Sequence, residues 1–336
     1  MNILISSHRF WPDLGGIETA SALLAQEFAS RHHEVRIITE TVESDDRSWP
    51  FPIVRRPSPR EILSLAGWCD VFFQNNISLK SLWAGLLLRK PCIVTHQTWI
   101  RQPNGASNWT SRLKRALLRF TTNVSISEPI AEHIGVPSVR IDNPYDEQIF
   151  RAYPGIERSL ELAYLGRLVS DKGVDILLDA LGKLHAKGLR PQLTIIGQGP
   201  EEAAMRQLVK DLNLEQQVSF AGSLSGDSLA RMLNRHKILV IPSRWAEPFG
   251  IVALEAIACG CVVVGSEKGG LPQAIGPCGL TVPNENAGAL ADALARLLSD
   301  PELLARYGGE AARHLKTHTA QAVADAYLRV FAAASQ

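Results

Sequence analysis

The chain has 336 residues, of which 46% are hydrophobic and 21% are charged, and its formal net charge is +1. This composition is typical of a soluble globular protein and excludes a disordered or fibrous one. Attraction of nucleic acid over a distance needs a strong field of one sign, so no nucleic-acid partner is indicated. The length exceeds what a single hydrophobic core usually spans, and we therefore expect two domains.

Cysteine usage and the amino terminus indicate a reducing compartment. The five cysteines are an odd number without a Cys-x-x-Cys pair, so neither a disulfide framework nor a zinc site is predicted. The first residues lack the basic start and long apolar core of a signal peptide, and no apolar run approaches the roughly 18 residues of a membrane span. We expect a cytoplasmic protein without a metal cofactor, in solution or at the inner face of the membrane.

In the first 150 residues, short apolar segments typical of strands alternate with helical patterns. A glycine turn and a helical pattern over 17–29 follow the first strand, and a proline-containing stretch around 50–59 is expected to be irregular. The expected strands are 2–6, 35–39, 71–73, 92–95 and 124–126. Alternation of strands and helices predicts a parallel, doubly wound sheet.

A second alternating series follows a loose, turn-rich segment near residue 155. Its expected strands are 162–165, 193–196, 218–220, 238–241 and 262–264. From 287 to 334 the pattern is helical, with a fresh start at Asp300-Pro301. We expect an α/β protein of two Rossmann-like, doubly wound domains, 1–150 and 155–317, facing a cleft that holds the chemistry. The last helix, about 318–336, is a candidate to pack back onto the first domain.

Two cations follow the first strand of the second half. Arg167 and Lys172 lie in a glycine-flanked run, 166–173, that joins this strand to a helix. Because a helix N-terminus already attracts anions, this placement favours a phosphate or diphosphate ligand. The alternative is a pair of solvated cations in a surface turn.

Two carboxylates lie in the segment 242–255, which joins the strand 238–241 to the next helix. Gly250 would let a ligand approach the backbone amides of Ile251 and Val252. Glu247 lies before the helix and Glu255 about two turns along it, so they are expected to serve different parts of one extended ligand. A carboxylate can accept from vicinal sugar hydroxyls. Alternatively, Glu247 caps the helix and Glu255 is an exposed or ion-paired residue.

Three further features have a functional and a structural interpretation. His96 follows the strand 92–95, where a histidine can be catalytic or merely structural. The turns at 15–16 and 269–270 offer glycine pairs for close backbone approach. The basic amphipathic segment Arg112 to Phe120 could contact anionic lipid through Arg112, Lys114, Arg115 and Arg119, or pack its apolar side, with Leu113, Leu117 and Phe120, on the sheet.

With these motifs in this order, the sequence resembles the retaining, nucleotide-sugar-dependent glycosyltransferases of the family 4 (glycosyl transferases group 1) type, nearly end to end. The resemblance is carried by the runs 15–18, 166–173, 242–243, 247–250, 255–256 and 269–272. It implies the GT-B architecture of two Rossmann-like domains. Two positions depart from the family pattern: Gln273 stands where Glu is usual, and Cys261 where Pro is usual.

The resemblance also implies a role for individual residues. Arg167 and Lys172 would hold the donor diphosphate and offset its charge as it leaves, without a metal. Glu247 would contact the donor sugar, Glu255 the ribose, and His96 the transferred sugar. The remaining donor-site positions would be Gly15, Gly16, Phe249, Gly250, Ile251 and Val252 around the phosphates, and Gly222, Ser223 and Leu224 beside the base.

The resulting expectation is a retaining glycosyltransferase that moves a hexose from a nucleoside diphosphate sugar to a glycan, a lipid-linked or a small glycosyl acceptor. Two alternatives remain open. One is a GT-B nucleotide-sugar epimerase, which needs several acid and base residues near the sugar. The other is a non-catalytic nucleotide-sugar-binding partner subunit, to which only the departure at Gln273 points.

Overall fold

The computed structural model describes residues 1–13, 15–42, 47–100 and 109–335. The chain separates into two compact units. Unit 1 comprises Met1–Tyr145 and His318–Gln336, and unit 2 comprises Asp146–Thr317. The first unit thus ends at Tyr145, somewhat before the boundary near residue 155 that the turn residues suggested. The C-terminal segment belongs to unit 1 although it follows unit 2 in the sequence.

Unit 1 is built on a seven-stranded parallel sheet with the order β3-β2-β1-β4-β5-β6-β7. Its strands are β1 (Asn2–Ser7), β2 (Glu34–Thr39), β3 (Ile53–Arg55), β4 (Val71–Asn75), β5 (Cys92–His96), β6 (Thr122–Ser125) and β7 (Val139–Arg140). The central strands are buried on both faces and rich in β-branched and aromatic residues, as parallel sheets require. The strand order reverses at β1 and β4, which makes their carboxyl ends a topological switch point.

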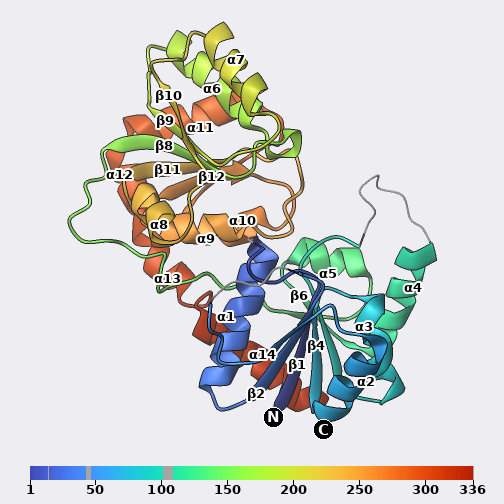
Figure 1. The fold of residues 1–336 in the computed structure, drawn as a ribbon. Coiled ribbons are helices and arrows are strands. Elements are labelled where there is room, and N and C mark those ends of the chain that lie inside the picture. The colour runs from blue at the N-terminus through green and yellow to red at the C-terminus, as the bar shows by residue number, and fades with distance from the viewer. Residues whose placement is uncertain (14, 43–46, 101–108, 336) are drawn as a thin grey trace. The chain divides into compact units, whose positions relative to one another are not determined.

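Helices cover both faces of this sheet. The helices are α1 (Gly16–Ser30), α2 (Pro59–Trp68), α3 (Leu79–Leu87), α4 (Trp109–Leu117), η1 (Leu118–Phe120), α5 (Glu128–Ile134) and α14 (Ala320–Ala334). In Figure 1, red α14 lies beside blue α1, and side chains of both helices join one hydrophobic cluster with the sheet. In that cluster Phe28, Phe73 and Phe331 are in mutual ring contact. The opposite face receives α3, which packs against Phe72 so closely that only glycine fits at position 85.

Unit 2 has a six-stranded parallel sheet with the order β10-β9-β8-β11-β12-β13. The strands are β8 (Leu160–Leu165), β9 (Leu193–Ile196), β10 (Val218–Gly222), β11 (His236–Ile241), β12 (Val262–Ser266) and β13 (Gly279–Val282). Here the order reverses between β8 and β11. Open α/β sheets bind ligands outside the carboxyl ends of strands at such a point. The two segments singled out in the sequence, 166–173 and 242–255, leave these two strands.

The helices of unit 2 complete the doubly wound arrangement. They are η2 (Ser170–Lys172), α6 (Val174–Ala186), α7 (Glu202–Asp211), α8 (Gly226–Asn234), α9 (Ile251–Ala258), α10 (Leu271–Ile275), α11 (Ala287–Ser299), α12 (Pro301–Gly309) and α13 (Ala311–Leu315). Side chains of α6 and α11 share one large apolar cluster with the sheet. Among the described residues, none of the helices in either unit has the length and apolar character needed to cross a bilayer.

The expected fold class, two doubly wound parallel α/β units, is confirmed. Each strand expected from the sequence is present, but β3, β7 and β13 were missed. These three form sheet edges and are only three, two and four residues long. Such short segments carry no clear periodicity and become strands because a neighbouring strand supplies their hydrogen bonds. The proline-containing stretch expected to be irregular therefore includes β3.

Candidate active site

Glycine brings the two key segments of unit 2 together. Gly173 ends η2 and begins α6 with a φ of 67°, a conformation that L side chains rarely adopt. A Cβ atom at this position would lie 2.1 Å from the backbone oxygen of Pro242, the residue that follows β11. The η2 turn therefore lies directly against the carboxyl end of β11, as the topological switch point requires.

An ion pair forms across this contact. Lys172 Nζ lies 2.6 Å from Glu247 Oε1, and Ser243 Oγ donates to the same oxygen at 2.7 Å. The Lys172 and Glu247 side chains are only 26% and 13% exposed. Glu247 makes no cap on α9, which begins without a side-chain cap, so the capping alternative is wrong. The two residues to which the resemblance gave separate roles are direct partners.

Arg167 lies in the same loop and contributes an uncompensated positive charge. It is exposed, and no acidic side chain among the described residues forms an ion pair with it. The Tyr164 hydroxyl donates to its backbone oxygen at 2.9 Å and fixes the backbone of the loop. Arg167, Lys172 and Glu247 together carry one net positive charge, which suits a phosphate group.

The loop that carries Glu247 is held by a residue that the sequence reasoning missed. The Arg244 guanidinium makes two hydrogen bonds to the carboxylate of Asp175 on α6, and one of its nitrogens donates to the Ser170 oxygen. The backbone amides of Arg244 and Trp245 both donate to the backbone oxygen of Asp171. The only sequence signal was an arginine next to Pro242-Ser243, and its partners lie about 70 residues away in the chain.

The glycine pair 269–270 supports the same loop from the next strand. The backbone amide of Gly270 donates to the backbone oxygen of Glu247 at 2.7 Å, and Glu247 forms an isolated parallel bridge with Gly269. A Cβ atom at Gly269 would lie 2.2 Å from that oxygen. The turn thus positions Glu247 through its backbone, a role that the sequence did not indicate.

Gly250 lies directly before the first turn of α9, where the sequence analysis expected a ligand to approach the backbone amides. Gly250 precedes the helix with a φ of 113°, and the first-turn amides of Ile251 and Val252 need no intrahelical partner. The side chains of Phe249 and Ile251 are buried, at 2% and 8% exposure. We therefore expect any ligand contact of these two residues to use their backbone atoms.

Glu255 occupies the second turn of α9 and is half-buried. Loss of solvent around the carboxyl, and secondly the negative charge of Asp146, raise its pKa from 4.5 to about 7. The carboxyl group therefore holds its proton to a higher pH than an ordinary glutamate does. Glu255 is not fully exposed, and it forms no ion pair with a described residue, so neither form of the structural alternative is found.

The segment expected beside the nucleobase lies at the carboxyl edge of the same sheet. β10 ends at Gly222, whose φ is 71° and whose oxygen accepts from the Gly197 amide at 2.7 Å. Ser223 is exposed and Leu224 is half-buried. β10 is separated from β8 by β9, so these residues lie two strands from the Lys172–Glu247 pair.

The remaining expected site residues belong to unit 1. Gly15 and Gly16 are exposed and open α1, which has no side-chain cap. A Cβ atom at Gly15 would lie 2.5 Å from a carboxylate oxygen of Glu18. His96 is the last residue of β5 and is 1% exposed.

The tautomer of His96 follows from its partner. The Asn123 amide nitrogen donates to the backbone oxygens of Leu118 and Thr121, so Asn123 Oδ1 is the acceptor for His96 Nε2, 3.1 Å away. Nδ1 then carries the lone pair. Burial lowers the pKa of His96 to about 4, so the ring is neutral at physiological pH. It can accept a hydrogen bond through Nδ1 but holds no proton there.

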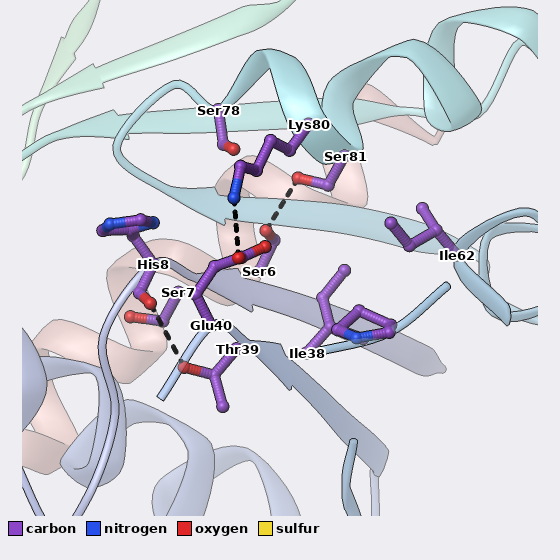
Figure 2. A pocket seen from close by; sticks show the side chains of 11 residues that line it. Ser6, Ser7, His8, Ile38, Thr39, Glu40, Ile62, Ser78, Lys80 and Ser81 are labelled. Carbon is purple, nitrogen blue, oxygen red and sulfur yellow. Dashed lines mark hydrogen bonds and ion pairs between the residues drawn. The ribbon is translucent and has the colours of Figure 1, made fainter. Parts of the chain in front are cut away.

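Unit 1 also contains a small polar hollow (Figure 2), which the sequence did not indicate. It lies where β1 and β2 end and α3 begins, and Lys80 and Glu40, which line it, form an ion pair of 2.7 Å. Ser6 and Ser81 face each other inside it with their hydroxyls 2.9 Å apart. Its volume of about 20 Å³ has room for a water molecule but not for a sugar. None of the expected site residues lines it.

The basic segment 112–120 lies in α4 and η1, and two of its apolar residues are exposed instead of packing on the sheet. Leu113 is 40% exposed and Phe120 72% exposed, whereas Leu118 is the fully buried residue. Trp109, at the start of α4, is 72% exposed. The expectation that the apolar side packs on the sheet is therefore wrong for Leu113 and Phe120.

Of the four cations in this segment, Arg115 forms hydrogen bonds within unit 1 and Lys114 is half-buried. Arg115 donates to the backbone oxygens of His133 and Ile134 and so caps the C-terminus of α5. Lys114 is half-buried, and loss of solvent lowers its pKa. Arg112 and Arg119 remain exposed.

Comparison with solved structures identifies the fold as GT-B. HepE of Anabaena, solved in complex with UDP, superposes with a TM-score of 0.84 at 20% sequence identity, covering 99% of this chain and 100% of the other. The chain belongs to the glycosyl transferases group 1 family, whose model matches residues 146–314, half of the chain. The match covers unit 2 and therefore Arg167, Lys172, Glu247 and Glu255.

Curated relatives agree with this assignment. A glycogen synthase of Mycobacterium tuberculosis is 30% identical over 254 residues, which are 72% of this chain and 61% of the relative. A D-inositol 3-phosphate glycosyltransferase of Rhodococcus opacus is 30% identical over 226 residues, 60% of this chain and 50% of the relative. The chain thus spans about half the length of the curated relatives that it matches.

Proposed function

We propose that this chain is a retaining glycosyltransferase that transfers a hexose from a nucleoside diphosphate sugar to a glycan, a lipid-linked or a small glycosyl acceptor. The observation that carries the proposal is the Lys172–Glu247 pair at the switch point of unit 2, beside Arg167, which forms no ion pair with any described residue. This constellation lies within the family match. The similar protein HepE was solved in complex with UDP, which supports a nucleoside diphosphate as the donor's leaving group.

In this proposal the two cations stabilise the leaving diphosphate. Negative charge grows on the phosphate oxygens as the bond to the sugar breaks, and Arg167 and Lys172 are held where that charge develops. Lys172 is already fixed by Glu247, so little reorganisation is needed when the phosphate arrives. These two residues take the role of a metal ion.

Glu247 and His96 would orient the transferred sugar. Glu247 Oε1 is occupied by Lys172 and Ser243, while no described residue donates to Oε2, which is left for a sugar hydroxyl. Neutral His96 would accept from another hydroxyl through Nδ1. The ionised form of Glu255 would accept from the ribose hydroxyls, and the α9 amides would contact phosphate.

Retention of configuration would follow from transfer on one face of the sugar. The acceptor oxygen forms the new bond to the anomeric carbon on the side that the diphosphate leaves. A leaving phosphate oxygen takes the acceptor's proton, so no protein nucleophile is required. Linkage analysis of the product by NMR tests this step, since an inverted anomeric centre would exclude it.

The activity is tested by incubating the full chain with a panel of nucleoside diphosphate sugars and acceptors. Acceptor-dependent release of nucleoside diphosphate supports the proposal. A free epimeric sugar formed without an acceptor would instead identify an epimerase. Calorimetric binding of nucleotide sugars without turnover over the panel would identify a binding subunit, and no binding would exclude the proposal altogether.

We also propose that the protein acts in the cytoplasm and that α4 rests on anionic lipid at the inner face of the membrane. Trp109, Leu113 and Phe120 offer exposed apolar surface beside the exposed cations Arg112 and Arg119. Flotation with anionic vesicles should show binding that falls with salt and is lost in Phe120→Ser. Arg60→Ala, on an exposed residue of α2, serves as the matched control. Binding independent of lipid charge would contradict the proposal.

A further inference from the structure

A groove opens at the amino-terminal edge of the unit 2 sheet, away from the candidate active site. Glu161 and Lys237, which line it, are the second residues of β8 and β11. Arg167 and Glu247 lie beyond the carboxyl ends of the same strands, so roughly 20 Å of strand separates the two places. The groove has a volume of about 340 Å³, which is within the range of small-molecule sites. We call it the basal groove.

The walls of the basal groove are mainly apolar. They are formed by the loop after α6 and by α11 and α12, with the side chains Leu189, Pro191, Leu298, Pro301 and Leu304. The three leucines pack against the hydrophobic core of unit 2 but are only half-buried, so each keeps apolar surface in the groove. Burial of that surface against an apolar ligand would be favourable, because it removes apolar area from water.

The charged side chains of the basal groove are two cations and one carboxylate. Arg190 is exposed and Lys237 is half-buried, and neither forms an ion pair with a described residue. β8 and β11 pair on both sides of Glu161 and Lys237, yet no ion pair joins these two side chains. Glu161 Oε2 instead accepts from the backbone amide of Gln192 at 3.1 Å. The groove therefore has one net positive charge and two cations available to a ligand.

We propose that the basal groove binds a small apolar molecule that carries one carboxylate group. The apolar walls cover the body of this ligand, and Arg190 and Lys237 bind its carboxylate. The site is distinct from the donor site and does not rest on the proposed function.

The net charge of the groove selects the anionic group of the ligand. A carboxylate carries one negative charge and leaves the groove neutral. A phosphate monoester carries close to two charges at neutral pH, and would leave a net negative charge beside Glu161. An uncharged ligand of the same shape would bury the same apolar surface but would leave both cations without a partner. The carboxylate is therefore the group that the groove fits best.

The experiment uses four probes that share one apolar body and differ in charge. Naphthoate carries one negative charge, naphthalenemethanol none, naphthyl phosphate close to two, and naphthylmethylamine one positive charge. Saturation-transfer NMR measures the affinity of each probe for the full chain, with and without saturating UDP to occupy the candidate donor site. We expect naphthoate to bind most tightly of the four in the presence of UDP. Its affinity should be the same without UDP.

Variants of an exposed cation test whether the groove holds the probe. Arg190→Gln should weaken naphthoate binding about tenfold, the effect of one lost hydrogen bond to a charged group, and leave naphthalenemethanol unaffected. Arg190→Glu reverses the charge, and naphthylmethylamine should then bind more tightly than naphthoate. Lys268→Gln is the matched control, because it removes an exposed cation that follows β12 at the opposite edge of the sheet. It should change neither affinity.

A variant of the wall tests the apolar part of the site. Leu304→Ala removes half-buried apolar surface from the groove, so naphthoate and naphthalenemethanol should both bind more weakly. The Arg190 variants keep the test decisive if this variant fails to fold, since they change an exposed side chain.

Several outcomes would overturn the inference. Equal affinities of the four probes would indicate an unselective apolar surface, and tightest binding of naphthyl phosphate in the presence of UDP would indicate a site for a dianion. Displacement of naphthoate by UDP would place the probe at the donor site. Arg190 variants that bind like the parent chain, or no binding of naphthoate, would also exclude the site. The proposed function is judged separately, by nucleotide binding and sugar transfer, which none of these results measures.

Discussion

At the scale of single residues, the candidate site depends on a carboxylate shared by a lysine and a serine. Glu247 accepts from Lys172 and Ser243 through one oxygen, so its position depends on both η2 and the end of β11. Because these residues follow predicted strands, the sequence indicated that they would lie at the same edge of the sheet, at the carboxyl ends of its strands. It could not predict the ion pair, because Lys172 and Glu247 are 75 residues apart and meet only when β8 and β11 become neighbours.

Replacement of Lys172 by alanine should slow transfer by a factor of about one hundred or more. The loss of one preorganised group that stabilises the leaving charge costs about 3 kcal/mol of transition-state stabilisation. Steady-state kinetics with a saturating donor would measure it. Lys187→Ala, which removes a surface ion pair with Asp292 in the same unit, is the control and should retain full activity. Unchanged turnover in Lys172→Ala would remove this residue from the mechanism.

Glu255 should make the stability of the protein depend on pH. Its pKa is raised in the folded state, so its contribution is fully present below about pH 4.5 and is lost as the pH rises through about 7. The shift corresponds to about 3 kcal/mol at most, and partial solvent access reduces the expected effect to about 1–2 kcal/mol.

Urea unfolding at a series of pH values measures this effect against Glu255→Gln, which does not titrate. The parent chain should lose stability relative to the variant between about pH 5 and pH 8. A constant difference across that range would mean that the carboxyl has its ordinary pKa in the folded protein. A parent chain that gained relative stability with rising pH would reverse the sign and contradict the burial argument.

At the scale of elements, the junction between η2 and α6 leaves no room for a side chain. Gly173 combines a left-handed backbone with a 2.1 Å approach of its missing Cβ to Pro242. Gly188, which follows α6, has a similar φ of 80° but nothing within 4 Å of its missing Cβ. The two positions separate the cost of backbone conformation from the cost of a collision.

Gly173→Ala should destabilise unit 2 by clearly more than Gly188→Ala. The backbone strain of a residue with positive φ costs about 1–3 kcal/mol and applies to both variants. Only Gly173→Ala must also move the end of β11, which should displace Glu247 and reduce activity. Urea unfolding and turnover of both variants measure the difference. Equal stability losses with equal activity would show that the junction tolerates a side chain.

The elements also mark where sequence patterns failed. Hydrophobic periodicity predicted each long central strand and α9, because these are strongly patterned by burial. It missed the edge strands β3, β7 and β13. It also suggested the wrong surroundings for Leu113 and Phe120, because an amphipathic pattern shows that one side of a helix is apolar but not whether protein covers that side.

At the scale of the whole molecule, the chain closes unit 1 only with its last helix. α14 contributes Val323, Ala324, Tyr327 and Phe331 to the core of unit 1. The Tyr327 hydroxyl receives a hydrogen bond from Thr95 Oγ1 of β5 at 2.9 Å, 232 residues away in the chain. Unit 1 therefore depends on residues that are synthesised after the whole of unit 2.

Phe331→Ala should destabilise unit 1 selectively. Phe331 is fully buried, and such a truncation costs about 3–5 kcal/mol. Calorimetric unfolding should show one transition moved to lower temperature and another near its original position. Arg329→Ala, on the exposed side of the same helix, should change neither transition. A uniform shift of both transitions would show that the units unfold as one.

The sequence by itself determined the α/β class, the two-unit plan, the family and the segments that carry Arg167, Lys172, Glu247 and Glu255. Strand periodicity and glycine placement are local signals, and the motifs lie at the ends of predicted strands. Only the tertiary structure decided that Lys172 pairs with Glu247, that Arg244 fixes the loop and that Phe249 is buried. These properties depend on the strand order and on contacts between residues tens to hundreds of positions apart, which no local pattern encodes.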